Sequence, residues 1–391
     1  MAEPRVCIYQ PYLPPDPSGA GKQALTLARA LLQRNVEVIL LGDRSSASGM
    51  EDTIDGVPVR WVRELPPGRG YPTLLRYWGR IGAALLQLRR RFDVLQLHGA
   101  PFELLGAIPT ARLLGKGIVV RTSLAGELAN LRTSPTRRFK RGVLRLAHQY
   151  VALSTAILEE AVDCTMPASR ITRIPNGVDR KVYRPVDAAT RVRLRRELDL
   201  PINSRLMIYH GVFMERKSLH WLIQMMEPIL DELDLTLVLV GGATRDESET
   251  GYARALRRQV SDSPARDRIQ LRGFSADVQW FLQAADLYIL PSTGEGLPNA
   301  LLEAMACGLV PLASRTSGTE DVIWDGTSGF LFEPRDASSF RNALSRCLAD
   351  GETRLREVSK AAVARIDEEY SIEATAERYL EVYRRAAKNS R

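Results

Sequence analysis

Short apolar runs alternate with helical segments from one end of the chain to the other, and this alternation restricts the fold more than any other feature. The first series of runs consists of Val6–Tyr9, Val36–Leu41, Asp93–Leu97, Gly117–Arg121 and Tyr150–Leu153. The second series consists of Leu206–Tyr209, Leu235–Val240, Ile269–Arg272, Leu287–Leu290, Val310–Ala313 and Gly329–Phe332. Runs of this length, separated by helices such as Gln23–Gln33, are typical of parallel β-sheets that helices cover on both faces.

Two such series in a chain of 391 residues predict an α/β protein with two doubly wound, Rossmann-like domains that face each other across a cleft. This length also exceeds what one ordinary hydrophobic core accommodates. We expect an N-terminal domain at residues 1–178 and a C-terminal domain at residues 179–369. Residues 370–391 contain a terminal helix, Ile372–Lys388, which we expect to pack back on the N-terminal domain.

Composition excludes several classes of protein. With 45% hydrophobic and 26% charged residues, the chain has the profile of a soluble globular protein. The four cysteines form no Cys-x-x-Cys pair and there are four histidines, so we expect neither a disulfide framework nor a zinc site. The N-terminus lacks the apolar core of a signal peptide, and no run of 18 apolar residues could span a membrane. These features predict a cytoplasmic protein.

Positive charge is concentrated in the first part of the chain. The formal net charge is +8, and residues 1–150 hold 22 Lys and Arg against 11 Asp and Glu. This part contains an amphipathic helical pattern at residues 74–92 and six basic side chains within residues 131–145. A solvated helix face explains either segment alone. Together they favour peripheral binding to an anionic membrane surface over nucleic acid, for which no recognition module is present.

The stretch Ser292–Gly308, STGEGLPNALLEAMACG, contains two glutamates eight residues apart. Apart from Glu303, the residues of Ala300–Cys307 are aliphatic, Ala, Met or Cys, so we expect this helix to be largely buried. A buried carboxylate without a partner costs several kcal/mol. Glu303 therefore needs a partner.

The position of this helix suggests an anion site. It connects two predicted parallel strands, with Pro298 suited to its first position and Gly308 to its end. The backbone N–H groups of residues 296–299 are expected to attract phosphate. Glu295 and Glu303 could then accept hydroxyl groups on either side of a diphosphate, and that ligand is a nucleotide sugar. The alternative is that Glu295 is a solvated loop residue and Glu303 pairs with a neighbouring arginine.

The segment resembles the Glu-x7-Glu signature of retaining glycosyltransferases with the two-domain GT-B fold, a group that includes glycogen synthases and mannosyltransferases. Further segments resemble this family in the family's order: IPNGVD at Ile174–Asp179, GVFMERK at Gly211–Lys217, Leu239–Gly242 and Leu271–Phe274. The resemblance covers nearly all of the second domain.

The resemblance implies a role for each residue of the donor site. Glu303 is expected to bind the ribose of the donor, Glu295 the transferred sugar, and Lys217 the diphosphate. The backbone near Gly273 and Phe274 is expected to hold the base. On this view the ligand supplies the partner of Glu303, and Glu295 and Lys217 are the catalytic residues. The remaining expected donor contacts are Arg216, Gly296, Leu297, Pro298 and Asn299.

One position departs from the family pattern, because Val212 stands where the family has a diphosphate-binding arginine. Either Arg216 compensates or the donor is held differently. In an extended segment Arg216 and Lys217 point to opposite faces, which predicts that Lys217 acts alone and that Arg216 matters little. A solvated basic pair is the remaining interpretation.

The segment Gly19–Ala24, GAGKQA, allows several interpretations. It fails as a P-loop because the first glycine and the Ser or Thr are missing. It matches a dinucleotide fingerprint followed by Asp43, but the proline-rich residues 10–18 separate its glycines from the strand end. The resembled family uses such a loop against the donor phosphate, with Gly19 as the best match. A surface loop without a ligand is the remaining alternative.

Contacts to the sugar or the acceptor are expected in the first domain at His98, Gly126 and Glu127. His98 ends a predicted strand. The family commonly places a histidine after the following strand, where this chain reads Val120–Glu127 without one. We therefore assign no histidine a catalytic role.

Together these features predict a retaining glycosyltransferase that moves a sugar from a UDP- or GDP-sugar to a hydroxyl of a glycan, lipid-linked or phospholipid acceptor. No carboxylate cluster accompanies the phosphate site, so we expect no cofactor and no essential metal. One rival is an NAD-dependent oxidoreductase built on Gly19–Ala24 and Asp43. The other is a catalytically idle sugar-nucleotide-binding or scaffold protein, which Val212 and the missing histidine in Val120–Glu127 make credible.

Overall fold

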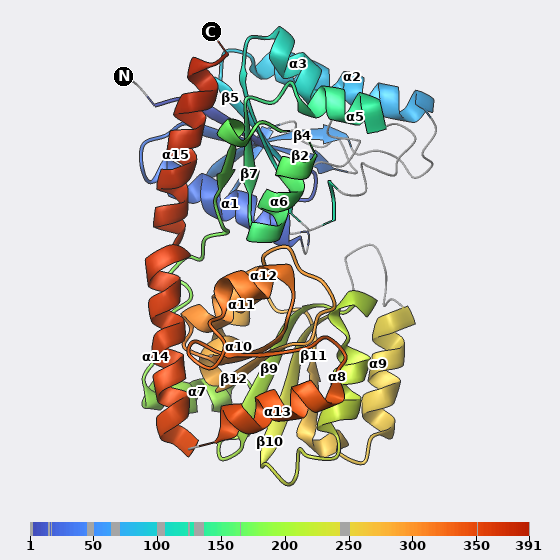
Figure 1. The fold of residues 1–391 in the computed structure, drawn as a ribbon, viewed down its shortest axis with the longest axis vertical. Coiled ribbons are helices and arrows are strands. Elements are labelled where there is room, and N and C mark those ends of the chain that lie inside the picture. Colours follow the sequence, from blue (N-terminus) through green and yellow to red (C-terminus); the bar gives the residue numbers. More distant parts are fainter. Residues whose placement is uncertain are drawn as a thin grey trace. The chain divides into compact units, whose positions relative to one another are not determined.

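The chain forms two compact α/β units in the computed structural model (Figure 1). The structure describes residues 3–14, 16, 18–44, 51–63, 71–99, 106–123, 126–128, 137–164, 166–242, 251–349 and 351–390. The first unit comprises Met1–Gly177 with Ile372–Arg391, and the second comprises Val178–Ser371. The first unit ends one residue before the expected residue 178, and the second unit ends two residues after the expected residue 369.

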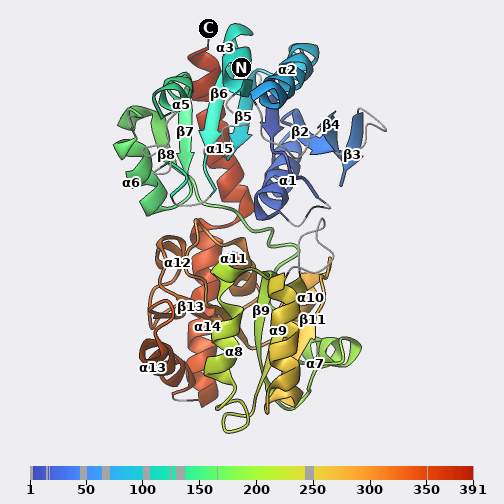
Figure 2. The ribbon, with the colours of Figure 1, turned by 90° about the vertical axis from the view of Figure 1, so that its right-hand side faces the viewer.

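The first unit is built on an eight-stranded sheet (Figure 2). Its strands are β1 (Val6–Tyr9), β2 (Val38–Arg44), β3 (Glu51–Ile54), β4 (Val57–Arg63), β5 (Val94–His98), β6 (Gly117–Arg121), β7 (Gln149–Ala152) and β8 (Ile171–Arg173). They lie in the order β3-β4-β2-β1-β5-β6-β7-β8, and all neighbours are parallel except β3 and β4. The carboxyl ends of the parallel strands therefore share one edge.

The three strands that the apolar pattern did not reveal all lie toward the ends of the sheet. β3 and β4 form an antiparallel hairpin around Asp55 and Gly56, whose φ angles are 49° and 79°. Such a turn favours an Asp-Gly dipeptide, which was a signal in the sequence. Since β4 alternates between buried and half-buried residues, and β8 is half-buried throughout, neither strand forms a continuous apolar run.

Two helices from opposite ends of the chain fill one core of the first unit. They are α1 (Gly19–Leu32) and α15 (Ile372–Lys388), which pack with Val6, Ile8 and Val119 of the sheet. Within α15, Tyr379 and Tyr383 are fully buried. The hydroxyl of Tyr383 donates to Gln96 Oε1 on β5. The terminal helix is therefore part of the first unit. The other helices of this unit are α2 (Tyr71–Leu88), α3 (Ala107–Leu113), α5 (Arg137–Leu144) and α6 (Thr155–Asp163).

The second unit contains a six-stranded parallel sheet. Its strands are β9 (Arg205–Val212), β10 (Leu235–Gly242), β11 (Ile269–Arg272), β12 (Leu287–Leu290), β13 (Val310–Ser314) and β14 (Phe330–Phe332). In the order β11-β10-β9-β12-β13-β14 the direction of winding reverses between β9 and β12. Ligands of doubly wound sheets bind at such a switch point, outside the carboxyl ends of the strands.

All eleven predicted strands are present, which confirms the α/β fold class with parallel sheets. The helices of the second unit are α7 (Ala188–Glu197), α8 (Leu219–Met226), α9 (Gly251–Asp262), α10 (Val278–Ala284), α11 (Asn299–Ala306), α12 (Ser317–Val322), α13 (Ala337–Leu348) and α14 (Gly351–Glu369). Within the described part of the chain, no helix is both long and apolar enough to cross a membrane. The four cysteines are buried free thiols.

Removing the ring of Tyr383 should destabilise the first unit, because the ring fills a core that the sheet cannot close alone. We expect Tyr383→Ala to lower the free energy of unfolding by about 3–5 kcal/mol. Differential scanning calorimetry should show one of two transitions moving to lower temperature. The control is Glu381→Ala, an exposed position of the same helix. Equal shifts for both variants would contradict the packing role.

Candidate active site

A buried glutamate with two cations lies at the switch point of the second sheet. Glu295, in the loop after β12, is 6% exposed. Lys217 Nζ donates to its Oε1 at 2.6 Å, and Arg216 Nη1 lies 3.0 Å from its Oε2. Arg216 also donates to the carbonyl of Gly294 at 2.6 Å. The alternatives of a solvated loop glutamate and a solvated basic pair are therefore wrong.

The charges of this cluster determine its protonation. Burial raises the pKa of Glu295, but the charges of Lys217 and Arg216 together outweigh it and hold that pKa below its usual value. Burial also lowers the pKa of Lys217, against the attraction of Glu295. The ionised cluster carries two positive charges and one negative charge, so it keeps a net positive charge that an anion can use.

The backbone after β9 explains why both cations reach one carboxylate. Residues Glu215–Lys217 form a 3₁₀ turn rather than an extended segment. Ser218, which follows, has a φ of +52°, in the left-handed region. The expectation that Arg216 and Lys217 point to opposite faces was therefore wrong, because the alternation of an extended chain does not apply in a turn.

Val212, the departure from the family pattern, ends β9 close to this turn. Its carbonyl accepts a hydrogen bond from the Tyr209 hydroxyl at 3.0 Å. The guanidinium beside Glu295 comes from Arg216, four residues later in the chain. This geometry favours compensation by Arg216 over a site with one cation.

The second glutamate has a partner inside the protein. Glu303, on α11, is 6% exposed, and its Oε2 lies 3.0 Å from Nε2 of His210 on β9. A protein side chain therefore partners Glu303, whereas the sequence led us to expect this partner from the ligand or from an arginine. Sequence reasoning missed His210. The available signal was a polar residue within the otherwise apolar run of β9, directly before Gly211.

The loop between the two glutamates leads into α11. Pro298 is the N-cap residue, one position earlier than expected, and Gly308 follows the helix with a φ of +83°. The loop packs tightly on the start of α12, because a Cβ on Gly318 would lie 2.4 Å from the carbonyl oxygen of Gly296. Leu297 is buried and Asn299 begins the helix. The expected anion-binding backbone thus lies between Glu295 and Glu303 in the chain.

Gly273 and Phe274 follow β11, two strands from β9 in the same sheet. The Gly273 carbonyl accepts from the Gly241 N–H at 3.2 Å, and nothing lies within 4 Å of a Cβ built on Gly273. The Phe274 side chain is 68% exposed. These two residues therefore leave open space at the same edge of the sheet.

In the first unit, His98 belongs to a buried polar network. Its Nε2 contacts Gln96 Nε2, and its Nδ1 lies 3.5 Å from Arg121 Nη1. Arg121 in turn donates to Asn176 Oδ1. Burial, and then the charge of Arg121, lower the pKa of His98 well below its usual value. His98 is therefore neutral at ordinary pH.

Gly19 begins α1, whose N-cap residue Ser18 accepts from the Gly21 N–H at 3.1 Å. Gly21 has a packing reason to lack a side chain, since a Cβ there would lie 1.9 Å from the carbonyl oxygen of Tyr12. Asp43 accepts hydrogen bonds from the hydroxyls of Tyr77 and Tyr9. Packing explains why residue 21 is glycine, and the tyrosine hydroxyls explain why residue 43 is aspartate, so neither residue requires a bound dinucleotide.

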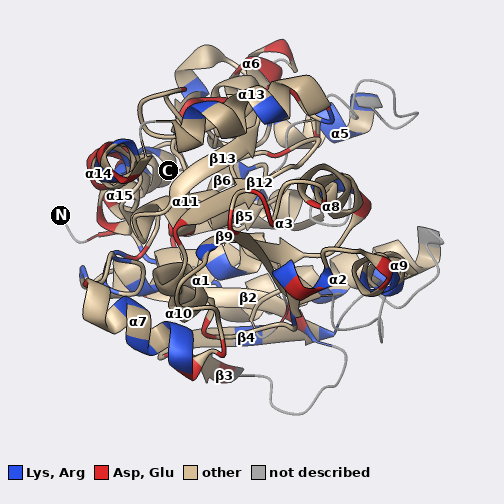
Figure 3. Ribbon diagram, turned by 90° about the horizontal axis from the view of Figure 1, so that it is seen from below, with Lys and Arg blue, Asp and Glu red and all other residues tan. Residues whose placement is uncertain are grey.

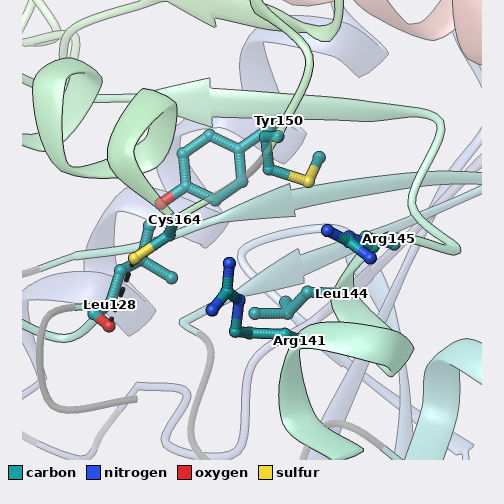
Figure 4. A pocket seen from close by; sticks show the side chains of 7 residues that line it. Leu128, Arg141, Leu144, Arg145, Tyr150 and Cys164 are labelled. Atoms are coloured by element: carbon teal, nitrogen blue, oxygen red, sulfur yellow. Dashed lines mark hydrogen bonds between the residues drawn. The ribbon is translucent and has the colours of Figure 1, made fainter. Parts of the chain in front are cut away.

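Gly126 and Glu127 lie in a short described segment of the first unit. The Gly126 N–H donates to Glu160 Oε2 at 3.1 Å, and Glu127 Oε2 accepts from the Ser123 N–H at 3.4 Å. A nearby cavity of about 10 Å³ is lined by Leu128, Arg141, Leu144, Arg145, Tyr150, Cys164 and Met166 (Figure 4). It has room for about one water molecule, so we assign it no organic ligand.

Family comparisons cover most of the chain. Residues 17–182 match the family model described as "Glycosyltransferase Family 4", and residues 204–350 match "Glycosyl transferases group 1". The N-acetyl-alpha-D-glucosaminyl L-malate synthase of Bacillus anthracis is 25% identical over 75% of each chain. A D-inositol 3-phosphate glycosyltransferase of Xylanimonas cellulosilytica is 31% identical over 61% of this chain and 59% of its own.

Similarity extends to another enzyme and to solved structures. The UDP-Gal:alpha-D-GlcNAc-diphosphoundecaprenol alpha-1,3-galactosyltransferase of Escherichia coli is 26% identical over 67% of this chain and 68% of its own. The Anabaena protein HepE, solved with UDP and glucose, has a TM-score of 0.79 at 19% identity, covering 97% of this chain and 98% of its own. Sucrose-phosphate synthase from Thermosynechococcus elongatus also reaches 0.79, at 20% identity with the same coverage. These two structures show the same fold.

Lys217 and Glu295 should affect the free energy of unfolding jointly, because they form a buried ion pair. Removing one partner of a buried pair typically costs about 3–5 kcal/mol, because the other charge stays buried. We expect Lys217→Met to be strongly destabilising in urea unfolding, and the double variant Lys217→Met with Glu295→Gln to lose less than the sum of the single variants. Lys181→Met, at an exposed lysine of the same unit, is the control. Additive losses would contradict the coupling.

Proposed function

Because this chain belongs to the GT-B glycosyltransferases, we propose that it transfers a sugar from a nucleotide diphosphate sugar to a hydroxyl of a glycan or lipid-linked acceptor. One observation carries this proposal: Glu295 and Glu303 are buried at the switch point of one parallel sheet, with Lys217 and Arg216 beside the first carboxylate. Polyol binding, phosphate binding and charge stabilisation can therefore occur within one site.

The two cations suit the leaving diphosphate. During transfer the bond from the anomeric carbon to the phosphate oxygen breaks, and its electron pair stays on the diphosphate. The acceptor oxygen forms the new bond and releases its proton. Fixed positive groups stabilise the charge that grows on the leaving group. We assign this task to Lys217 and Arg216, whose net positive charge with Glu295 supports it.

The remaining contacts follow from the position of each group. We assign Glu295 to hydroxyls of the transferred sugar, Glu303 to the ribose, and the start of α11 to a phosphate. The exposed Phe274 and the open space at Gly273 support a place for the base at this edge. We propose UDP or GDP as the nucleotide and retention of the anomeric configuration. UDP-Gal in the name of one relative and UDP in the HepE structure support the uridine donor.

The two rival functions lose support at particular residues. The oxidoreductase reading needs Asp43 for a ribose, whereas Asp43 is bonded to two tyrosine hydroxyls. The idle-protein alternative rests on Val212 and on the missing histidine, and the first of these grounds is weakened because Arg216 supplies a second cation beside Glu295. We also propose that no metal is essential, since two cationic side chains already lie beside the phosphate site.

Removing either cation should lower turnover. We expect Lys217→Met and Arg216→Met each to reduce release of UDP or GDP by roughly 10²–10³-fold, the usual effect of losing one donor to a developing charge. Excess EDTA should leave wild-type turnover unchanged, and proton NMR of the product should show the anomeric configuration of the donor.

The control for these variants is Arg268→Met, because Arg268 pairs with Asp231 and Asp234 away from the site. Full activity of Arg216→Met would leave Lys217 as the single phosphate-binding cation. Full activity of both site variants would place the phosphates elsewhere.

We further propose that the first unit docks on an anionic membrane, which would bring it to a lipid-linked acceptor. The stacked rings of Trp78 on α2 and Phe139 on α5, 6.4 Å apart, join these helices, and α3 contacts both of them. Leu113 is 89% exposed, and the surface also presents the exposed residues Leu75, Leu86, Phe139, Leu146, Arg138 and Arg145. We call this set the α2–α3–α5 surface. Residues 131–136 of the basic segment lie outside the described residues.

Charge reversal on this surface should weaken membrane binding. We expect Arg138→Glu with Arg145→Glu to abolish cosedimentation with phosphatidylglycerol vesicles, and added salt to weaken binding of the wild type, because exposed charges are screened. Arg193→Glu with Arg196→Glu makes the same charge change on α7 of the second unit and is the matched control (Figure 3). Equal loss in both double variants would reject a specific surface.

A further inference from the structure

His210 occupies an unusual place in the second sheet. It lies at the carboxyl end of β9, is 8% exposed, and packs with its ring centroid 5.6 Å from that of Tyr288 on β12. Its neighbours in β9, Ile208 and Tyr209, are buried and largely apolar. An apolar residue could fill this position without the cost of burying an imidazole. The hydrogen bond between His210 Nε2 and Glu303 Oε2, 3.0 Å long, offsets the cost of burying the imidazole.

We propose that His210 is a positioning residue, which holds the Glu303 carboxylate in the orientation that receives the ribose hydroxyls of a nucleoside diphosphate. The inference rests on the proposed function, in which Glu303 binds the ribose. It adds a residue that the family resemblance does not supply, in the strand directly before the segment GVFMERK.

The hydrogen-bond chemistry determines how His210 acts. A carboxylate accepts and does not donate, so Nε2 of His210 must carry a proton to bond Glu303. Both the Nε2–H tautomer and the imidazolium satisfy this requirement, whereas the Nδ1–H tautomer presents a lone pair to the carboxylate. The bond fixes Oε2 of Glu303 and thereby limits rotation of the whole carboxylate. A carboxylate held in advance loses less conformational freedom when the ligand binds.

The two glutamates of the site thus have different supports. Glu295 is held by two permanent cations, which suit a group beside a diphosphate. Glu303 is held by an imidazole, which can orient the carboxylate without adding a further permanent positive charge. Because the ribose does not take part in the bond rearrangement, support for Glu303 should affect donor binding equally in the ground state and the transition state. It should change KM and leave kcat unchanged.

Three substitutions separate positioning from packing. His210→Gln places an amide donor at about the position of Nε2. His210→Asn keeps an amide donor, but its shorter side chain does not reach Glu303, and His210→Leu removes the donor. Isothermal titration uses UDP, GDP and the 2′-deoxy and 3′-deoxy forms of the nucleotide that binds. We expect His210→Leu and His210→Asn to weaken binding of the parent nucleotide by roughly tenfold or more, and His210→Gln to stay within about threefold of wild type.

The deoxy nucleotides supply the decisive comparison. If His210 acts through Glu303 on a ribose hydroxyl, one deoxy form should bind wild type and His210→Leu equally weakly. With the donor sugar found by turnover, His210→Leu should raise KM and keep kcat. Equal weakening for parent and both deoxy nucleotides, or a lower melting temperature with unchanged affinity, would overturn the inference. If His210→Leu does not fold, the pair His210→Asn and His210→Gln decides.

Failure of the inference differs from failure of the proposed function. Wild-type protein that binds no nucleoside diphosphate overturns both, whereas wild-type binding with no effect at position 210 overturns the inference alone. His220→Gln is the control, since His220 lies on α8, is half-buried and bonds Gln259 outside the site. It should change neither affinity nor KM.

Discussion

Glu295 and Glu303 lie at one edge of the second sheet, with more than nine-tenths of each removed from water, and so each carboxylate must be compensated by donors from the protein. Those donors come from β9 and from the turn that follows it. The pairing of β9 with β12, in which Met207 faces Leu287, brings them to the carboxylates. The site therefore depends on a strand pairing between segments about eighty residues apart in the chain.

The features that could be predicted from the sequence, the strands and the two glutamates, are those that depend on neighbouring residues in the chain. The eleven strands that form short apolar runs could be predicted, because such runs are typical of strands that helices cover on both faces. The half-exposed strands β4 and β8 lack such runs and were missed. The two glutamates could be singled out because a carboxylate among aliphatic residues is costly, which is a local argument as well.

The partners of these residues could not be predicted in the same way. His210 is 93 residues from Glu303 in the chain, and no spacing rule joins a residue of β9 to one of α11. Arg216 was judged from the geometry of an extended chain, whereas the left-handed Ser218 ends a 3₁₀ turn there. The network of His98, Arg121 and Asn176 likewise joins three separate segments. Such contacts are set by sheet order and turn geometry, which local pattern specifies only in part.

Helix α15 completes the core of the first unit, although the whole second unit separates it from β8 in the chain. Strands β1 to β8 leave the ribosome while the helix that covers Val6 and Val119 is still unmade. The second unit, by contrast, is complete before α15 is made, so it can fold first although it is synthesised later. Apolar surface of the first unit must stay uncovered during this interval. Synthesis of α15, rather than of β8, is the event that allows the first unit to close.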